Sequence, residues 1–511
     1  MGKDETSRRR RLLAGIGFGL LLCALPALAD DRAGGADGGA TTQPAEANAD
    51  HLSVTKHSVT INGQQIDYEA TAGTIGLKDE EGKPKADFFF VAYVKQPADQ
   101  AATRPITFVF NGGPGAAAVW LHLGAVGPKR IELGPDGLPT APPHRLIDND
   151  QSWLDATDLV FIDPVGTGFS RAAGTYKPED FFGLENDIKS IAEFIRIYLT
   201  RYNRWSSPKY LAGESYGTTR AAGLADYLAD EDGIDLNGII LISSILNFET
   251  TNLQSGNDLP YALYLPSYTA IAIYHGKIHT SDEPRMLQEV SRWAETDYLA
   301  LLAKGSGLSE SDRRDAIERL SRYTGLAKDL IDRCDLRIDP GMFRKKLLAD
   351  QRLIIGRFDG RISGEDLKPG TDDSDFDPSL SYYFPVYSST FNDYIRRDLK
   401  YDSDLKYGVL NGVGPWNLMP EGGIGYPDVT ESLQRAMVGN PHLRVMVAAG
   451  WDDLATPFLS ANYTFDHLDP TGKLKERVTQ TYYPSGHMIY HDPSSLKQLK
   501  ADVAKFLEAG N

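Results

Sequence analysis

The chain has 511 residues, of which 41% are hydrophobic and 24% are charged, the composition of a soluble globular protein with one large domain or two to three smaller ones. Its net charge of −17 argues against nucleic acid or an anionic membrane as a partner, because phosphate binding requires clustered cations and no basic stripe follows the N-terminus.

Residues 1–29 predict a signal peptide. Residues 7–11 read SRRRR, an apolar run follows, and Ala27-Leu28-Ala29 matches a cleavage site. A membrane anchor is the alternative, but the run is short for one and is interrupted by Gly and Pro. Cleavage would leave Cys334 as the only cysteine, so no intramolecular disulfide is expected. We expect a periplasmic or secreted protein, exported by a bacterial general or twin-arginine route, without stable insertion in the membrane.

Residues 30–50 are small, polar and glycine-rich and predict a flexible linker. Residues 51–250 predict the first part of an α/β core. Asn62-Gly63 between alternating residues indicates a β-hairpin. Buried strand patterns then alternate with helical patterns, which predicts a mostly parallel sheet with helices on both faces. The strand patterns cover residues 85–96, 106–110, 158–163, 209–213 and 236–246, and the helical patterns cover 184–202 and 218–230.

Residues 251–405 predict a mainly helical cap inserted over one end of the sheet, because the helical patterns there have charged faces and no buried strand run occurs. The strand pattern resumes in residues 406–511, the second part of the core. Strands are expected at 443–450 and 478–486, and a closing helix at 494–509.

Residues 213–217 read GESYG, the pattern G-x-S-x-G, on a predicted strand-to-helix turn. The two glycines remove Cβ atoms where backbone segments crowd together. The helix N-terminus behind the serine directs free N–H groups toward a developing oxyanion. We therefore predict that Ser215 is a nucleophile, rather than an ordinary serine in a tight turn, and that the N–H of Tyr216 is one oxyanion donor.

A nucleophilic serine requires a base and an orienting acid, expected in the chain order Ser, Asp, His. His487 follows a predicted strand within a loop and is the predicted base. His467 lies in a helical pattern, and His491 is expected to bind locally or to face solvent. Asp452 and Asp453 both follow the predicted strand before it. The residues alone leave both open as the acid, with the other one structural, for example as a helix cap.

Residues 111–115 read NGGPG directly after a predicted buried strand. Three glycines allow the backbone to approach a substrate carbonyl group closely, so this loop is predicted to complete the oxyanion hole. No cofactor and no metal ion are expected, since the chain has neither H-E-x-x-H nor a paired-cysteine motif. The acidic residues 230–238 lack the spacing of a calcium loop and indicate a surface turn.

Together these motifs resemble the serine carboxypeptidase family of α/β hydrolases. The resemblance spans about residues 105–490 and implies the α/β-hydrolase fold and a serine-type carboxypeptidase acting on peptides. It also implies that Asp453 is the acid, because the family's catalytic aspartate is the second of the two in its G-D-x-D motif; Trp451 replaces the first. The motifs are NGGPG (111–115), DPVGTGFS (163–170), GESYG (213–217), GWDDLATP (450–457) and GHM (486–488).

The resemblance further implies roles for the residues around Ser215. Gly113 and Tyr216 match the residues whose N–H groups form the oxyanion hole. Asn111 and Glu214 match residues that bind the free C-terminal carboxylate of the substrate. The implied catalytic triad is therefore Ser215, Asp453 and His487.

Three further positions depart from the family pattern: Val109 stands where the family has Trp, Ala116 where it has Cys, and Ala125 where it has a second Glu. The predicted carboxylate-binding network thus lacks two partners. Without a second carboxyl group to share a proton, the pKa of Glu214 is expected to be raised less. We therefore expect weaker selection for free C-termini and a less acid pH optimum.

The leading hypothesis is a peptidase that releases C-terminal residues through an acyl-enzyme. The alternative is an esterase, amidase or acyltransferase that uses the same triad, because one set of catalytic residues serves many substrates. A non-catalytic binding protein on the same scaffold would have lost a member of the triad, and none is lost in this sequence.

Overall fold

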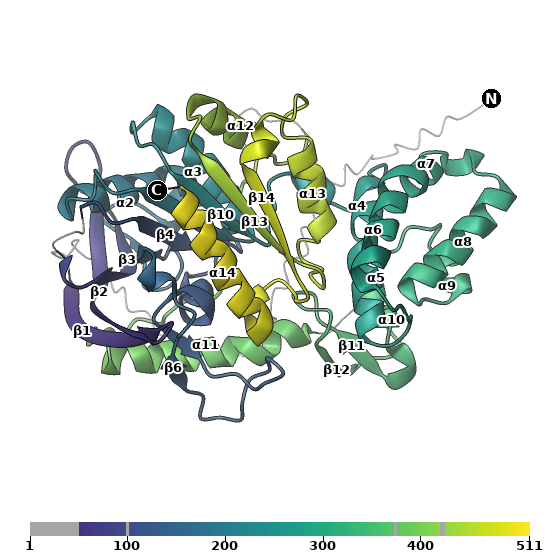
Figure 1. Ribbon diagram of the computed structural model, residues 1–511, viewed down its shortest axis with the longest axis horizontal. Helices are drawn as coiled ribbons and strands as arrows, with labels where there is room; N and C mark the ends of the chain where they lie inside the picture. Colours follow the sequence, from purple (N-terminus) through teal and green to yellow (C-terminus); the bar gives the residue numbers. More distant parts are fainter. Residues whose placement is uncertain (1–50, 99–101, 373–375, 420–424, 511) are drawn as a thin grey trace, which may run out of the picture. The chain divides into compact units, whose positions relative to one another are not determined.

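The computed structural model describes residues 51–98, 102–372, 376–419 and 425–510, and a ten-stranded sheet lies at its centre (Figure 1). The predicted signal peptide (1–29) and linker (30–50) fall outside the described residues. The strand order is β1-β2-β3-β7-β4-β9-β10-β13-β14, with β8 paired to β3. Pairing is antiparallel from β1 to β7 and parallel from β7 to β14.

Except for β8, which was not predicted, the strands of this sheet lie close to their predicted positions. They are β1 (Leu52–Ile61), β2 (Gln64–Lys78), β3 (Pro84–Lys95), β4 (Ile106–Phe110), β7 (Asp158–Ile162), β8 (Arg171–Ala172), β9 (Lys209–Glu214), β10 (Gly238–Ile242), β13 (Arg444–Gly450) and β14 (Val478–Tyr483). A separate antiparallel pair is formed by β5 (Lys129–Ile131) and β6 (Leu146–Asp148).

The predicted hairpin is present between β1 and β2, where Ile61 pairs with Gln64. Asn62 and Gly63 form its two-residue turn with φ angles of 51° and 76°. Both angles are positive, as the type I′ turn requires, and Asn-Gly is the dipeptide that adopts it most readily.

Helices cover both faces of the sheet because its central strands are apolar on both sides. In β4, Val109 belongs to one hydrophobic cluster and Phe108 and Phe110 to the other. One face packs against α1 (Val119–Leu121), α11 (Pro378–Arg397) and α14 (Pro493–Ala509). The other packs against α2 (Leu184–Arg201), α3 (Tyr216–Asp230), α12 (Thr430–Gly439) and α13 (Phe458–Asp466). The strand order and these two layers confirm the predicted α/β-hydrolase fold.

A group of helices between β10 and β13 has its own hydrophobic cluster, which also includes Ala449, Leu454, Phe458 and Leu459 at the end of β13 and the start of α13. The helices are α4 (Leu259–Leu263), α5 (Leu265–Tyr274), α6 (Glu283–Trp293), α7 (Leu299–Leu302), α8 (Glu310–Thr324), α9 (Lys328–Arg333) and α10 (Pro340–Lys346). We call this group the helical insertion.

The interval 251–405 contains two further features besides the helical insertion. A short antiparallel hairpin joins β11 (Leu353–Ile355) to β12 (Ser363–Glu365). Helix α11 packs against the sheet rather than within the cluster of the insertion, since Tyr387 and Tyr394 share a cluster with the sheet strands. Within the described parts of the chain, no helix has both the length and the hydropathy needed to cross a bilayer.

Candidate active site

Ser215 lies at the turn between β9 and α3, with φ of 60° and ψ of −131°. A non-glycine residue rarely adopts this conformation, and it persists only where the surroundings impose it. The Ser215 N–H donates to the carbonyl oxygen of Ile242 at 3.0 Å. A Cβ atom at Gly213 would lie 2.2 Å from the carbonyl oxygen of Gly217. The two flanking glycines therefore permit the strand-turn-helix geometry that the sequence predicts.

Asp453 and His487, which follow β13 and β14, form a buried hydrogen-bonded pair. The distance from His487 Nδ1 to Asp453 Oδ2 is 2.7 Å, and the exposed fractions of the two side chains are 2% and 0%. Asp453 Oδ1 accepts hydrogen bonds from the N–H groups of Ala455 and Thr456, and Oδ2 also accepts from the Thr456 hydroxyl at 2.7 Å. These bonds hold the carboxylate in place and keep Nδ1 of the histidine as the protonated nitrogen.

The pKa of His487 is raised above its ordinary value of 6.5. Burial alone would lower this pKa, but the charge of Asp453, the hydrogen bond to it and the charge of Glu214 together outweigh burial. The imidazolium form is therefore stabilised, as a general base requires when it accepts a proton.

Two bonds tie Ser215 and His487 to the same end of β10. Ser215 N–H bonds to Ile242, and the hydroxyl of Ser243 donates to the carbonyl oxygen of His487 at 2.6 Å. The Ser215 side chain is half-buried, and its hydroxyl makes no hydrogen bond to any described residue. In hydrolases without substrate, the hydrogen bond between the nucleophile and its base is often long and shortens when substrate binds.

Asp452, the other carboxylate that the sequence leaves open, points to different partners. It is buried, and its Oδ2 lies 3.8 Å from Nε of Arg361. It does not cap the following helix, whose N-cap is Pro457 without a side-chain hydrogen bond. The adjacent carboxylates thus face different partners, and Asp453 is the one that contacts His487.

The NGGPG loop lies directly against the serine turn. A Cβ atom at Gly112 would be 2.4 Å from the nitrogen of Tyr216, so only glycine allows the two backbones to come this close. Gly113 follows with φ of 100° and is exposed. Tyr216 is the first residue of α3, so its N–H has no partner four residues earlier within the helix. The structure thus brings together the two predicted oxyanion donors, Gly113 and Tyr216.

Asn111 and Glu214 are also in contact, buried beside the serine turn. Asn111 Nδ2 donates to Glu214 Oε1 at 2.9 Å, and Asn111 Oδ1 accepts from the N–H of Leu121 at 3.0 Å. Burial raises the pKa of Glu214 to about 7, against the lowering effects of His487 and Asn111. The sequence led us to expect a smaller increase in the absence of a second carboxyl group. Desolvation, which the sequence could not reveal, is the main cause of the increase.

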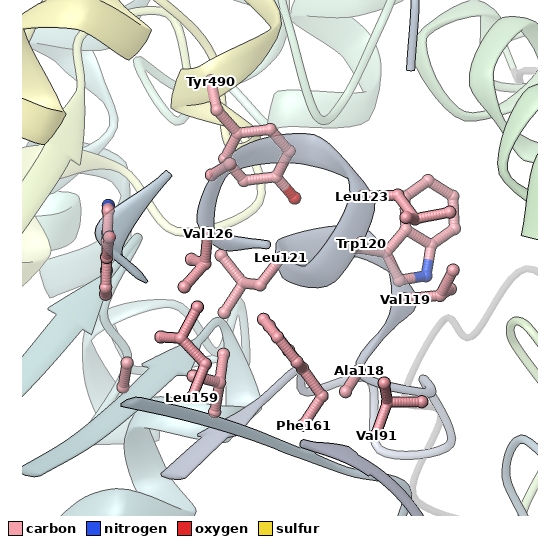
Figure 2. Close-up of a cluster of buried hydrophobic side chains, with 14 of the residues drawn as sticks. Val91, Ala118, Val119, Trp120, Leu121, Leu123, Val126, Leu159, Phe161 and Tyr490 are labelled. Carbon is pink, nitrogen blue, oxygen red and sulfur yellow. The ribbon is translucent and has the colours of Figure 1, made fainter. Parts of the chain in front are cut away.

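The positions where the family's Trp and second Glu are missing are occupied by apolar packing. Val109 and Ala125 are fully buried. Tyr490 packs beside the π-helical turn that contains Ala125 (Figure 2). A Cβ atom at Gly124 would lie 2.3 Å from Cε2 of Tyr490. After burial, the charge of Glu214 is the largest cause of the raised pKa of Tyr490, so this phenol is close to the carboxylate.

A buried ion pair that the sequence analysis missed supports the turn from behind. Arg220 donates to both carboxylate oxygens of Asp187, at 2.7 and 3.1 Å, and to the carbonyl oxygen of Asn111 at 2.6 Å. Tyr216 Oη donates to Asp187 at 3.0 Å. Arg220 follows the motif by only three residues, but nothing in the sequence identifies Asp187 as its partner.

The other two histidines considered as bases lie elsewhere. His467 is exposed and follows the last residue of α13, in agreement with the helical pattern of the sequence. His491 is buried, so of the two expected alternatives it binds locally and does not face solvent: its Nε2 lies 2.9 Å from Tyr387 Oη. Its ring stacks on Tyr383 with 3.7 Å between centroids, and burial lowers its pKa to about 3. No group of three or more His, Cys, Asp or Glu side chains within the described residues is arranged to hold a metal ion.

Comparison with known proteins gives a family match for part of the chain. Residues 62–303 match the family model described as serine carboxypeptidase. Serine carboxypeptidase-like 12 of Arabidopsis thaliana is 26% identical over 196 residues, which are 36% of this chain and 42% of that protein. The pheromone-processing carboxypeptidase KEX1 of Saccharomyces cerevisiae is 28% identical over 211 residues, which are 38% of this chain and 27% of that protein. The aligned part is therefore less than half of either relative.

Among solved structures, the chain is similar to the prohormone-processing carboxypeptidase Kex1(Δ)p from Saccharomyces cerevisiae. The TM-score is 0.49 with 18% identity, over 86% of this chain and 91% of that one. The matched segment 62–303 includes Ser215 and the NGGPG loop but ends before Asp453 and His487. Over residues 62–303, the chain matches the serine carboxypeptidase family, as its motifs predict.

Proposed function

We propose that this protein is a serine-type carboxypeptidase that releases C-terminal residues from peptides through an acyl-enzyme. The main support is the buried 2.7 Å hydrogen bond between His487 and Asp453, held at the same end of β10 as the strained turn of Ser215. The family match over residues 62–303 supports the same activity.

In this mechanism the Ser215 hydroxyl oxygen attacks the scissile carbonyl carbon, and His487 Nε2 takes the hydroxyl proton. Asp453 stabilises the resulting imidazolium. The N–H groups of Gly113 and Tyr216 would stabilise the negative oxygen of the tetrahedral intermediate. The C–N bond then breaks as His487 gives its proton to the leaving amine. Water repeats the cycle on the acyl-enzyme and releases the shortened peptide.

Asn111 and Glu214 would select the free C-terminus. A substrate carboxylate next to an ionised Glu214 would be repelled, whereas a neutral Glu214 can donate a hydrogen bond to it. Because the pKa of Glu214 is about 7, a large fraction of the protein carries the neutral acid near neutral pH. The expected loss of selectivity caused by Val109 and Ala125 is therefore offset in part by burial.

The experiment compares two peptides of the same sequence, one with a free C-terminus and one amidated. We expect release of the last residue from the free peptide and little release from the amidated one. Ser215→Ala should abolish both, which excludes a contaminating peptidase. Equal cleavage of both peptides would keep the nucleophile and rule out selection of a free C-terminus.

An esterase, amidase or acyltransferase is the second candidate, and the apolar residues Val109 and Ala125 favour it. These residues remove two partners that the family uses to bind the substrate carboxylate. Hydrolysis of simple esters, lost in Ser215→Ala, without release of an amino acid from either peptide would establish this alternative.

We also propose that the protein is exported and acts in a periplasm or outside the cell. The proposal rests on the leader-like residues 1–29. The mature chain would then consist of the linker 30–50, a core formed by 51–250 and 406–511, and a cap at 251–405. N-terminal sequencing of protein recovered from the exported fraction should begin near residue 30, and a mature chain that begins at Met1 would contradict the proposal.

A further inference from the structure

A turn between β11 and β12 lies against both loops that carry the proposed acid and base. We call residues 356–362 the hairpin turn. The N–H of His487 donates to the carbonyl oxygen of Phe358 at 2.5 Å, and the N–H of Leu454 donates to the carbonyl oxygen of Arg357 at 3.0 Å. The hairpin turn therefore bonds directly to the backbone of the base and to the residue after the acid.

A third backbone bond closes this arrangement. The N–H of Gly360 donates to the carbonyl oxygen of Asp452 at 2.9 Å, and the N–H of Asp452 donates to the carbonyl oxygen of Ser485 at 3.0 Å. The acid loop, the base loop and the hairpin turn thus form one hydrogen-bonded unit. Figure 1 shows β11 and β12 between the helical insertion and this end of the sheet.

Arg361 is the side chain that joins the three segments. Its Nε and Nη2 donate to the two carboxylate oxygens of Asp359 at 3.0 and 2.8 Å. Nη1 donates to the carbonyl oxygen of Pro484 at 2.8 Å, and Nη2 to the hydroxyl of Ser485 at 3.2 Å. One rigid guanidinium group therefore fixes the hairpin turn to the residues immediately before His487.

The same guanidinium lies among three carboxylates. Besides Asp359, it is 3.8 Å from Asp452 and 3.5 Å from Asp492, and its side chain is 17% exposed. Asp452 is covalently adjacent to the proposed acid, and Asp492 caps α14, the helix after the base loop. Replacing Arg361 by an uncharged residue would leave these carboxylates uncompensated, which is costly for the two that are buried, Asp359 and Asp452.

The hairpin turn packs closely against its neighbours on both sides. A Cβ atom at Gly486, directly before the base, would lie 2.4 Å from the carbonyl oxygen of Phe358 and 2.6 Å from Cα of Asp359. On the other side, a Cβ atom at Gly360 would lie 2.3 Å from Cδ1 of Ile271 in α5, and the His275 ring bonds to the carbonyl oxygen of Gly360 at 2.8 Å. The hairpin turn is thus packed between the helical insertion and the base.

We propose that Arg361 is a positioning residue, which through the hairpin turn holds the Asp453–His487 pair in register with Ser215. The expected fall in kcat rests on the proposed function, whereas the expected change at the His487–Asp453 hydrogen bond does not. It gives the helical insertion a role in catalysis, since α5 contacts the hairpin turn that fixes the base. A misplacement of a catalytic group by about 1 Å can reduce the rate about 100-fold.

The test compares Arg361→Lys with a matched variant, Arg204→Lys. The substitution of Arg361 by Lys keeps the positive charge but loses the bidentate contact with Asp359. Arg204 is a buried arginine, likewise paired with an aspartate, Asp158, at 2.8 Å, but Asp158 begins β7, at the opposite end of the sheet from the loops of the proposed acid and base. We expect kcat on the free peptide to fall about tenfold or more in Arg361→Lys with KM nearly unchanged, and both constants to stay within about twofold in Arg204→Lys. Thermal unfolding of both variants separates a loss of stability from a loss of positioning.

A second readout does not depend on any substrate. In protein labelled with ¹⁵N-histidine, the proton between His487 and Asp453 should give a downfield signal that is absent in His487→Ala. We expect this signal to shift or broaden in Arg361→Lys and to stay unchanged in Arg204→Lys. A shift specific to Arg361→Lys in a protein that cleaves no peptide would support the positioning role and refute the proposed function. Unchanged kcat together with an unchanged signal in Arg361→Lys would overturn the positioning role.

Discussion

The clearest consequence of the proposed function is that selection for a free C-terminus should depend on the ionisation of Glu214. The perturbation is Glu214→Gln, which keeps the shape of the side chain and an oxygen that can accept the hydrogen bond from Asn111. The variant cannot ionise, so it cannot repel a substrate carboxylate at any pH. We expect it to retain its preference for free peptides at high pH, where the wild-type protein loses it.

The magnitude follows from the pKa of about 7 for Glu214. One pH unit above this value, about 90% of the wild-type protein carries the ionised form, so its preference for the free peptide should fall about tenfold for each further unit. The amidated peptide carries no carboxylate, so the pH dependence of its cleavage reports only on His487. The pKa of His487 is raised above its ordinary value of 6.5, and cleavage should decline as the pH falls below this raised pKa. The ratio of kcat/KM for the two peptides therefore isolates Glu214.

The same shift predicts a stability change that needs no substrate. The pKa of Glu214 is about 7 in the folded protein and has its ordinary value of 4.5 in the unfolded chain, so at low pH Glu214 is neutral in both. As the pH rises from 4.5 to 7 the unfolded chain ionises first, and the protein loses about 3 kcal/mol of unfolding free energy. Above pH 7 the loss stays constant. Glu214→Gln should be free of this loss.

The assay measures kcat/KM for the free and amidated peptides from pH 5.5 to 8.5 for both proteins, together with urea unfolding at pH 5 and pH 8. The reasoning is refuted if the wild-type ratio of free to amidated cleavage does not change across pH 7. It is also refuted if Glu214→Gln gains no stability relative to wild type between pH 5 and pH 8.

Four further substitutions test other parts of the site. Asp453→Asn should lower kcat about 10⁴-fold, because the amide favours the wrong tautomer of the base. Asp452→Asn should lower kcat less than tenfold. Equal losses of kcat in steady-state assays would contradict the assignment of Asp453 as the acid. Gly112→Ala should abolish turnover, because its Cβ atom would lie 2.4 Å from the nitrogen of a proposed oxyanion donor, and unchanged turnover would remove that loop from the site. Gly124→Ala should destabilise the protein by about 1–3 kcal/mol in urea unfolding, because its Cβ atom would overlap the ring of Tyr490. An unchanged unfolding midpoint would show that the ring moves freely.

Most of the fold could be predicted from the sequence because its signals are local. The Asn62-Gly63 turn, the short apolar strands and the helix after Ser215 depend on residues that are neighbours in the chain. The G-x-S-x-G pattern likewise requires only that a strand precede it and a helix follow it. For the same reason the serine turn and the NGGPG loop can be identified from the amino-acid sequence alone.

The choice between the two carboxylates could be made from the family resemblance but not from the physics of the sequence. Asp452 and Asp453 are adjacent and chemically identical. Which of them contacts His487 depends on the backbone bonds of Asp452 to Ser485 and Gly360, residues that come from two other segments of the chain. Tertiary contacts therefore decide what the local sequence leaves open.

The remaining features depend on burial and on partners distant in sequence. Nothing in the sequence distinguishes Arg361 from an ordinary surface arginine, yet its contacts reach Asp359, Pro484 and Ser485 at once. The raised pKa of Glu214 likewise results from desolvation by packed segments. The amino-acid sequence specifies the chemical groups and the turn that presents the serine. The orientation and solvation of those groups come from the folded chain, because both depend on contacts between residues far apart in the sequence.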